Sequence, residues 1–359
     1  MKRMMNRQPG NSRGNPANVP AKTRLRGLTL IELMIALTLS MLVLGVIIAI
    51  LMGSRQTYRV NEAMTRMQDN ARYAFQVLSR DIRGAGYFGC AGADVVPTNT
   101  LNGPTDFLYS FGRAIQGYEA TGSSAWTPAP DGSITSPLGG TDIIVIRGVE
   151  GSDVNVPSYT ITAPSTAPGS TDDPKVPSAS GLATGDVVLV SDCLAAAIFQ
   201  ITGMTAGAFY TVGHVAGAGA PGNATKDLGK AYTGGKILKI ATRVYYIRTN
   251  SDGRPALFRK AGAAAAEEVV EGVENMQVQY GEDTSPNRDL TADVYRNADA
   301  VADWSRVVSV RVSLLMQTID NNVASQAQRY TYNGATTTPA DRRLRQIYST
   351  VIALRNRAP

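Results

Sequence analysis

An uninterrupted apolar segment follows a polar N-terminus and dominates the hydropathy pattern of this 359-residue chain. It runs from Leu28 to Met52, and Glu32 is the charged residue within it. At about 1.5 Å per residue, a helix of this length spans the roughly 30 Å hydrocarbon core of a bilayer. The pattern therefore predicts a membrane-spanning helix over residues 28–52.

Beyond this segment, apolar residues recur at spacings of three and four, which is the stripe of an amphipathic helix. The stripe consists of Val60, Met64, Met67, Ala71, Phe75, Leu78 and Ile82. Polar residues are expected on the other faces, namely Arg59, Glu62, Arg66, Asp69, Arg72, Arg80 and Asp81. Gly84 and Gly86 supply a stop. We therefore expect one continuous helix, apolar on all sides over residues 28–52 and amphipathic over residues 53–84.

The residues before the apolar segment carry the excess positive charge of the chain. Residues 1–27 hold seven of the 35 Lys and Arg residues and no acidic residue, so we expect a disordered leader. The other 28 basic residues face all 29 acidic ones, which gives a general nucleic-acid interaction no support. A basic flank keeps the N-terminus in the cytoplasm and places the head outside. A secretory signal peptide is the alternative, but its apolar region is usually shorter and does not continue into a helix.

Strand-like runs and turn-forming residues alternate beyond residue 84. They predict an antiparallel β-rich head over residues 85–359, and with the long helix an α+β fold class. The runs span residues 142–149, 186–191, 198–202, 236–248, 256–259, 273–280, 307–317 and 346–354. Thr249–Pro255 supplies the turn of a hairpin. Residues 151–182 and 203–224, rich in Pro, Ser, Thr, Gly or Ala, are expected to be long surface loops or insertions.

The residue inventory leaves little room for catalysis or metal binding. His214 is the single histidine, which excludes a site with two histidine ligands, and two cysteines cannot form a four-cysteine zinc site. We assign His214 no role. No phosphate-binding glycine loop or catalytic carboxylate pair is present in the sequence. We therefore expect no enzyme activity, no cofactor and no metal.

Two charged clusters near the C-terminus have competing interpretations. Five aspartates could supply oxygen ligands to calcium, but their spacing matches no compact calcium loop, so a solvated acidic loop is preferred. They are Asp283, Asp289, Asp293, Asp299 and Asp303. Five arginines could contact DNA phosphates or protect a strand edge against aggregation. They are Arg342, Arg343, Arg345, Arg355 and Arg357.

The junction between leader and apolar segment resembles the type IV prepilin signature. The sequence Arg26-Gly27-Leu28-Thr29-Leu30-Ile31-Glu32 joins a basic leader, a glycine and a glutamate at the fifth position after that glycine. The resemblance implies that a prepilin peptidase cleaves between Gly27 and Leu28 and N-methylates Leu28. It also implies that Glu32 neutralises the α-amine of a neighbouring subunit during assembly. Leu28 departs from the usual phenylalanine, and the leader is longer than many.

Four blocks of the chain resemble PilW, a large minor pilin of type IV pili. They are RDIRGAGYFGC, VVEGVENMQVQYGED, DWSRVVSVRVSLLMQT and RRLRQIYSTVIALRNR, whereas residues 91–235 carry no such signature. The resemblance implies a type IV pilin-like fold and a role with other minor pilins in a priming or tip complex. The implied partners are other minor pilins, the major pilin, the prepilin peptidase, the inner-membrane assembly machinery and a tip adhesin. The implied location is the inner membrane, with the head in the periplasm, and then the pilus.

Two other functions stay open at this point. A component of a type II secretion system similar to pseudopilin J would share the N-terminus and a β-rich head. A pilus-tip protein that binds DNA or a host surface directly belongs to a different functional class. The size of the head and the C-terminal blocks favour PilW.

The two cysteines face an oxidising compartment under this topology, so a disulfide between Cys90 and Cys193 is expected. The bond encloses a loop of about 100 residues, worth up to roughly 4.7 kcal/mol in the chain-entropy account. Two separate buried thiols are the alternative. A bond would tie the end of the helix to the first half of the head.

Overall fold

The computed structural model describes residues 27, 29–89, 95–150, 158–160, 173–176, 181–232 and 234–357. The chain divides into two compact units, residues 1–56 and residues 57–359. Helix α1 (Leu30–Arg83) contributes its first half to one unit and its second half to the other. The predicted long helix is therefore confirmed, and it begins two residues later than expected.

The first half of α1 has no core of its own. Its leucine, isoleucine, valine and methionine side chains are exposed on every side; Leu30 is 77% exposed and Met41 79%. Among the described residues, α1 is the one helix that is long and apolar enough to cross a membrane. These properties are compatible with membrane anchoring, as the sequence predicts.

Glycines end the helix where the sequence predicts. α1 stops at Arg83, and Gly86 follows in the left-handed region at φ +68°. A side chain at Gly86 would place its Cβ 2.8 Å from the Cβ of Ala114, so the close approach also requires glycine. The Gly86 N–H donates to Arg147 O at 2.8 Å, which joins the end of the helix to the head.

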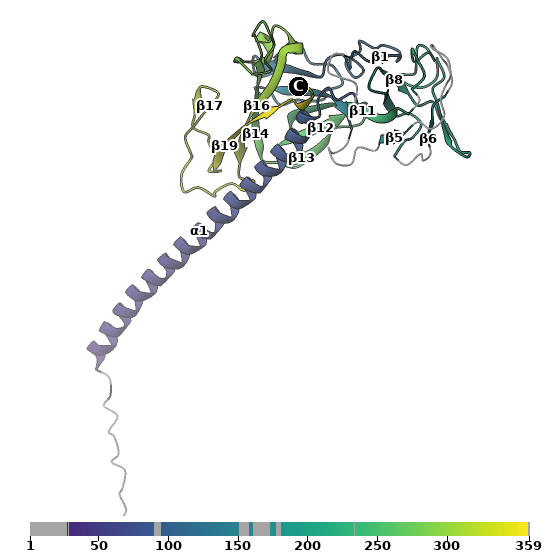
Figure 1. The fold of residues 1–359 in the computed structure, drawn as a ribbon. Coiled ribbons are helices and arrows are strands. Elements are labelled where there is room, and N and C mark those ends of the chain that lie inside the picture. The colour runs from purple at the N-terminus through teal and green to yellow at the C-terminus, as the bar shows by residue number, and fades with distance from the viewer. Residues whose placement is uncertain are drawn as a thin grey trace, which may run out of the picture. The chain divides into compact units, whose positions relative to one another are not determined.

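The head contains two large sheets with small additions, and their strands pair antiparallel except that β1 is parallel to β8 (Figure 1). The ten-stranded sheet runs in the order β1 (Thr98–Asn99), β8 (Ala196–Gln200), β7 (Val187–Ser191), β11 (Lys236–Thr249), β4 (Ile143–Val149), β2 (Ile115–Ala120) and β3 (Trp126–Thr127). Strands β12 (Pro255–Ala261), β13 (Glu267–Glu271) and β5 (Ser158–Thr160) join it off this path. The four-stranded sheet runs in the order β15 (Val294–Arg296), β14 (Val273–Glu282), β16 (Val307–Gln317) and β19 (Arg345–Ala353).

Shorter elements complete the described part of the head. A three-stranded sheet has the order β6 (Lys175–Val176), β10 (Tyr210–Gly213) and β9 (Gly203–Thr205). A hairpin pairs β17 (Tyr330–Tyr332) with β18 (Ala335–Thr337). Three short 3₁₀ helices are η1 (Ala298–Ala300), η2 (Trp304–Arg306) and η3 (Arg355–Arg357).

Strand β11 links the two ends of the larger sheet. Its first residues, Lys236–Lys239, pair with β7, whereas Ile240–Tyr245 pair with β4. Its last part forms the predicted hairpin with β12, joined by the turn around Gly253. Strands β1, β5, β6 and β8 accordingly lie at one end of the head, and β14, β16, β17 and β19 lie at the other (Figure 1).

All eight predicted runs form strands, and β16 has the predicted bounds. Two longer strands, β2 and β13, were not predicted, because a glycine and a glutamate interrupt β2 and three glutamates lie in β13. The expectation of loops over residues 151–182 and 203–224 is wrong in part. The described residues there include β5 and β6 in the first range, and β9 and β10 in the second.

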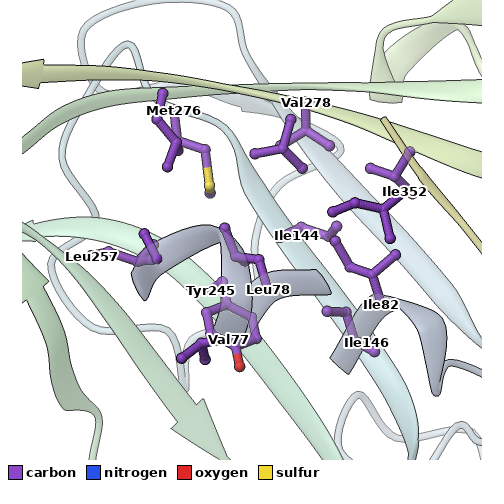
Figure 2. Packing of buried hydrophobic residues seen from close by; sticks show 14 of the residues in the cluster. Val77, Leu78, Ile82, Ile144, Ile146, Tyr245, Leu257, Met276, Val278 and Ile352 are labelled. Carbon is purple, nitrogen blue, oxygen red and sulfur yellow. The ribbon is translucent and has the colours of Figure 1, made fainter. Parts of the chain in front are cut away.

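The second half of α1 is packed between the two large sheets (Figure 2). Its buried residues include the small side chains Ala71 and Ala74, which allow the strands to approach closely. Leu78 and Ile82 reach the centre of the cluster and are 0% exposed. They pack among Ile144, Ile146, Tyr245 and Leu257 from the larger sheet and Met276, Val278 and Ile352 from the smaller one. The stripe residues Met67, Ala71, Leu78 and Ile82 are buried, while Val60, Met64 and Phe75 are half-buried.

Two buried carboxylates lie between the sheets. Asp142 accepts from Ala120 N at 3.0 Å and from Val278 N at 2.8 Å, which joins β2 to β14. Glu119 accepts from Asn297 Nδ2 at 3.0 Å. Burial raises the pKa of Glu119 to about 7 and that of Asp142 to about 6. The folded chain therefore retains protons that the unfolded chain releases near pH 4–5.

Glu119→Gln is expected to change how stability depends on pH. Because folding raises the pKa of Glu119, its carboxyl group contributes stability at pH values below its pKa in the unfolded chain. This contribution is lost as the pH rises through its pKa in the folded chain, which is about 7. At pH 8 the buried charge of Glu119 destabilises the parent chain, and the variant lacks this charge. The melting temperature of the variant should therefore exceed that of the parent by roughly 2–4 °C for each ~1 kcal/mol of destabilisation removed. At pH 5 the two should melt together. Thermal unfolding of the full chain in detergent checks this, and an equal difference at both pH values would contradict it.

Candidate functional site

The start of α1 is a capping box formed by Thr29 and Glu32. The Thr29 N–H and Oγ1 donate to Glu32 Oε2 at 3.1 and 3.0 Å, and the Glu32 N–H donates to Thr29 Oγ1 at 3.3 Å. These reciprocal bonds satisfy backbone donors at the helix N-terminus, where negative charge is also favoured by the helix dipole. Glu32 thus has a local structural role that our sequence analysis missed, although the Thr-x-x-Glu pattern signals it.

The predicted processing site lies just before this capping box. Gly27 is exposed, and a Cβ placed on it would meet no atom within 4 Å. Leu28 lies outside the described residues, so cleavage and methylation there stay predictions. Glu32 is exposed within the first unit, so its carboxylate is accessible to a partner while it caps the helix.

A buried polar cluster fixes the second half of α1 in the head. Asp81 is 2% exposed and accepts a hydrogen bond of 2.5 Å from Tyr245 Oη on β11. The Arg243 guanidinium, also on β11, approaches Asp81 Oδ2 at 3.5 Å, and Arg80 Nε approaches Oδ1 at 3.2 Å. Burial and the Asp81 carboxylate raise the pKa of the Tyr245 hydroxyl well above its usual value, which keeps this hydroxyl a donor.

The expected placement of Asp81 on a polar face is therefore wrong. Asp81 follows Val77 by four residues and Leu78 by three, so it shares their buried face. A carboxylate is tolerated there because β11 supplies a hydroxyl and a guanidinium to it. The helix spacing alone would have indicated this burial.

The two cysteines are only partly described. Cys193 is disulfide-bonded and lies in an exposed turn after β7, at φ +69°. Cys90 lies outside the described residues, so the predicted pairing stays a prediction. The neighbouring positions are close, because a Cβ placed on Gly89 would lie 3.0 Å from the Cβ of Ser191. The segment that follows α1 thus lies next to the strand that leads to Cys193.

The acidic segment has the geometry of a self-contained loop. Asp283 accepts from Leu290 N at 2.8 Å and from Ser285 N at 3.0 Å. Asp293 accepts from Thr284 N at 2.8 Å. Over the described ranges, no group of three or more Asp, Glu, His or Cys side chains could hold a metal ion. The carboxylates organise the backbone of the loop, which favours the structural interpretation over calcium binding.

Three of the five C-terminal arginines make contacts within the head. Arg345 has a side chain that is 3% exposed and pairs with Glu274 at 2.6 Å and with Asp341 at 2.7 Å. Arg343 donates to Thr318 O at 2.8 Å. Arg342 donates to Asn322 Oδ1 at 2.9 Å. These contacts anchor the approach to β19 and give Arg342, Arg343 and Arg345 a structural role without DNA binding.

His214, which has no role in the sequence predictions, is fully buried beside β10. Its Nδ1 lies 3.0 Å from Asp173 Oδ1, and its Nε2 lies 3.0 Å from Lys226 O. Burial lowers the pKa of the imidazole despite the nearby carboxylate. The side chain thus lies between the segments that hold Asp173 and Lys226 and links them to the end of β10.

Comparisons with known proteins address the head and the fold. Residues 244–356 match the family model PilW, described as type IV pilus-assembly protein W. No curated protein matches the chain. A solved structure that matches is a type IV-like pilin from Thermus thermophilus, with 12% sequence identity, 82% of this chain and 99% of that chain covered. Its TM-score of 0.33 is too low to carry an argument.

The matched residues hold the part of the head that completes the packing around α1. They include the last part of β11, residues 244–249, and all of β12, β14, β16 and β19. Strands β14 and β16 contribute Met276 and Val312 to the core that encloses the helix. A long N-terminal apolar helix and a β-rich head accompany this match, and residues 244–356 are similar to the PilW family of type IV pilus-assembly proteins.

Proposed function

We propose that this protein is a minor pilin that takes part in a priming or tip complex of the type IV pilus with other minor pilins. The observation that carries the proposal is the start of α1. There a carboxylate five residues after Gly27 caps a helix whose first half is apolar and exposed. The PilW match of the head favours this role over a type II secretion pseudopilus.

The exposed apolar half of α1 has two natural environments, lipid before assembly and the helices of other subunits afterwards. Lipid and neighbouring helices are similarly apolar, so apolar contacts alone give little preference for one axial position. A carboxylate near the end of a spanning segment costs about 2.5–3.5 kcal/mol in lipid unless it is paired or close to water. Pairing of Glu32 with the α-amine of a neighbouring mature subunit would remove that cost and fix the register.

Cleavage is the first requirement of this role. We expect mature protein to begin at N-methylated Leu28, with the leader of residues 1–27 removed. Mass spectrometry of membrane and pilus fractions measures the N-terminal peptide directly. An intact leader in cells with active prepilin peptidase would refute the proposal at its first step.

We further propose that Cys193 pairs with Cys90 and ties the segment after α1 to strand β7. Support comes from the oxidised state of Cys193 and from the contact between Gly89 and Ser191. Peptide mapping without reductant should recover one linked pair of peptides. Recovery of an alkylated Cys90 thiol from periplasm-facing protein would reject this pairing.

A further inference from the structure

We propose that strand β19 pairs edge to edge with β19 of a second copy of this chain. β19 is the last strand of the four-stranded sheet, and among the described strands it pairs with β16 alone. The pairing with β16 continues over 9 residues without a shift in register. The other edge of β19 is therefore a straight row of backbone groups. This inference does not depend on the proposed pilus role.

The hydrogen bonds show which residues of β19 direct their backbone groups outward. Alternate residues of a strand direct N–H and C=O to the same side. Just past β19, the Leu354 N–H donates to Val308 O at 2.9 Å, so even-numbered residues face β16. Arg345 faces outward, because Gln328 donates to its O at 2.9 Å and accepts from its N at 2.7 Å. The outward residues that follow are Ile347, Ser349, Val351 and Ala353.

The Gln328 side chain satisfies the backbone N–H and C=O of Arg345, the first outward-facing residue. Among the described residues, the backbone groups of the next four outward-facing residues have no backbone partner on that side. Natural edge strands are usually protected by charges, proline or a bulge. Residues 346–353 contain no charged residue and no proline. Ile347 and Val351 are 41% and 51% exposed. An edge that is this long, regular and apolar favours pairing with another strand.

The sequence of β19 favours a second copy as that strand. With a two-fold axis at Thr350, antiparallel pairing places Ser349 opposite the partner's Val351 and Ile347 opposite the partner's Ala353. This register uses all four outward residues of each strand, forms about eight backbone hydrogen bonds, and leaves the capped Arg345 outside. No charged side chains face each other across it. The opposite edge of the sheet is β15, with 3 residues, so the isologous pairing closes at two copies.

Cysteine cross-linking tests the register directly. One tagged full-length copy carries Ser349→Cys, and a second copy with a different tag carries Val351→Cys. Facing residues in a hydrogen-bonded pair lie about 5.5 Å apart at Cα, which suits a disulfide. Oxidation in membranes should link the two tags as the main product. Copies with Ser325→Cys, in an exposed loop, should stay unlinked, and equal linking of this control would overturn the proposal.

Substitutions at the same edge separate strand pairing from contacts between apolar helices. Ser349→Pro removes an outward N–H and leaves the backbone hydrogen bonds to β16 in place, whereas Ser349→Ala keeps that N–H. Both variants lose the hydrogen bond from Ser349 Oγ to Ser313 Oγ on β16, so their difference reports the N–H. In detergent, the dimer should weaken at least tenfold for Ser349→Pro and be unchanged for Ser349→Ala. Val351→Lys should weaken it similarly and covers the case in which the proline variant does not fold. A monomeric parent chain, a dimer insensitive to both substitutions, or links solely to a different protein would overturn the proposal.

Discussion

Glu32→Gln is expected to abolish most surface piliation while leaving membrane insertion and leader cleavage intact. Glutamine can replace glutamate in a capping box, so the bonds with Thr29 at the start of α1 are retained. The substitution removes the charge, which lowers the cost of insertion into lipid and eliminates attraction to a neighbouring amine. Loss of only about 1.4 kcal/mol per contact corresponds to a tenfold weaker association. Co-purification of partner minor pilins from detergent and counts of surface pili provide the measurement.

Matched variants separate the two roles of this residue. Thr29→Ala removes the hydroxyl that accepts from the Glu32 N–H and keeps the carboxylate, so it should cost about 1 kcal/mol at the helix start and leave assembly near the parent level. Glu32→Asp keeps the charge on a shorter side chain and should be partly defective. Parent-level association and piliation in Glu32→Gln would show that the carboxylate serves as a helix cap alone.

The long helix and the central strands could be predicted because their patterns are locally complete. Apolar spacings of three and four identified the face that packs on the sheets, and β16 alternates over its whole length. Strand β13, with three glutamates in 5 residues, could not be predicted, because its place in the sheet depends on pairing with β12. Its backbone partners compensate for a sequence that disfavours a strand.

The sequence identified the residues of the candidate site that form a local signature, but not the tertiary partners of a buried charge. The sequence marks Gly27, Leu28 and Glu32 through their order along the chain, since the signature is local. The helix spacing indicates the burial of Asp81, but not its partners, because Arg243 and Tyr245 lie on a strand more than 160 positions away. A local pattern identifies an apolar stripe, but the partners of a buried charge come from tertiary structure.

Asp81→Ala is expected to cause the largest loss of stability of any single substitution considered for the head. It removes the acceptor of the Tyr245 hydroxyl and the anion beside Arg243, whose side chain is 4% exposed. Breaking a buried ion pair on one side costs about 3–5 kcal/mol, because the remaining charge is left without compensation. A typical domain has about 5–15 kcal/mol of total stability, so a large share would be lost.

The matched control is Asp69→Ala on the same helix. Asp69 pairs with Arg72 at 3.7 Å, and both side chains are exposed, so its removal should cost no more than about 0.5 kcal/mol. Urea unfolding of the full chain in detergent, monitored by tryptophan fluorescence, measures both variants. Trp304 reports on the head because its ring packs against Tyr280. Adding Tyr245→Phe to Asp81→Ala should cost much less than Tyr245→Phe alone, since the hydroxyl has already lost its acceptor. Equal midpoints for Asp81→Ala and Asp69→Ala would show that the packing of Leu78 and Ile82 holds the helix without the buried cluster.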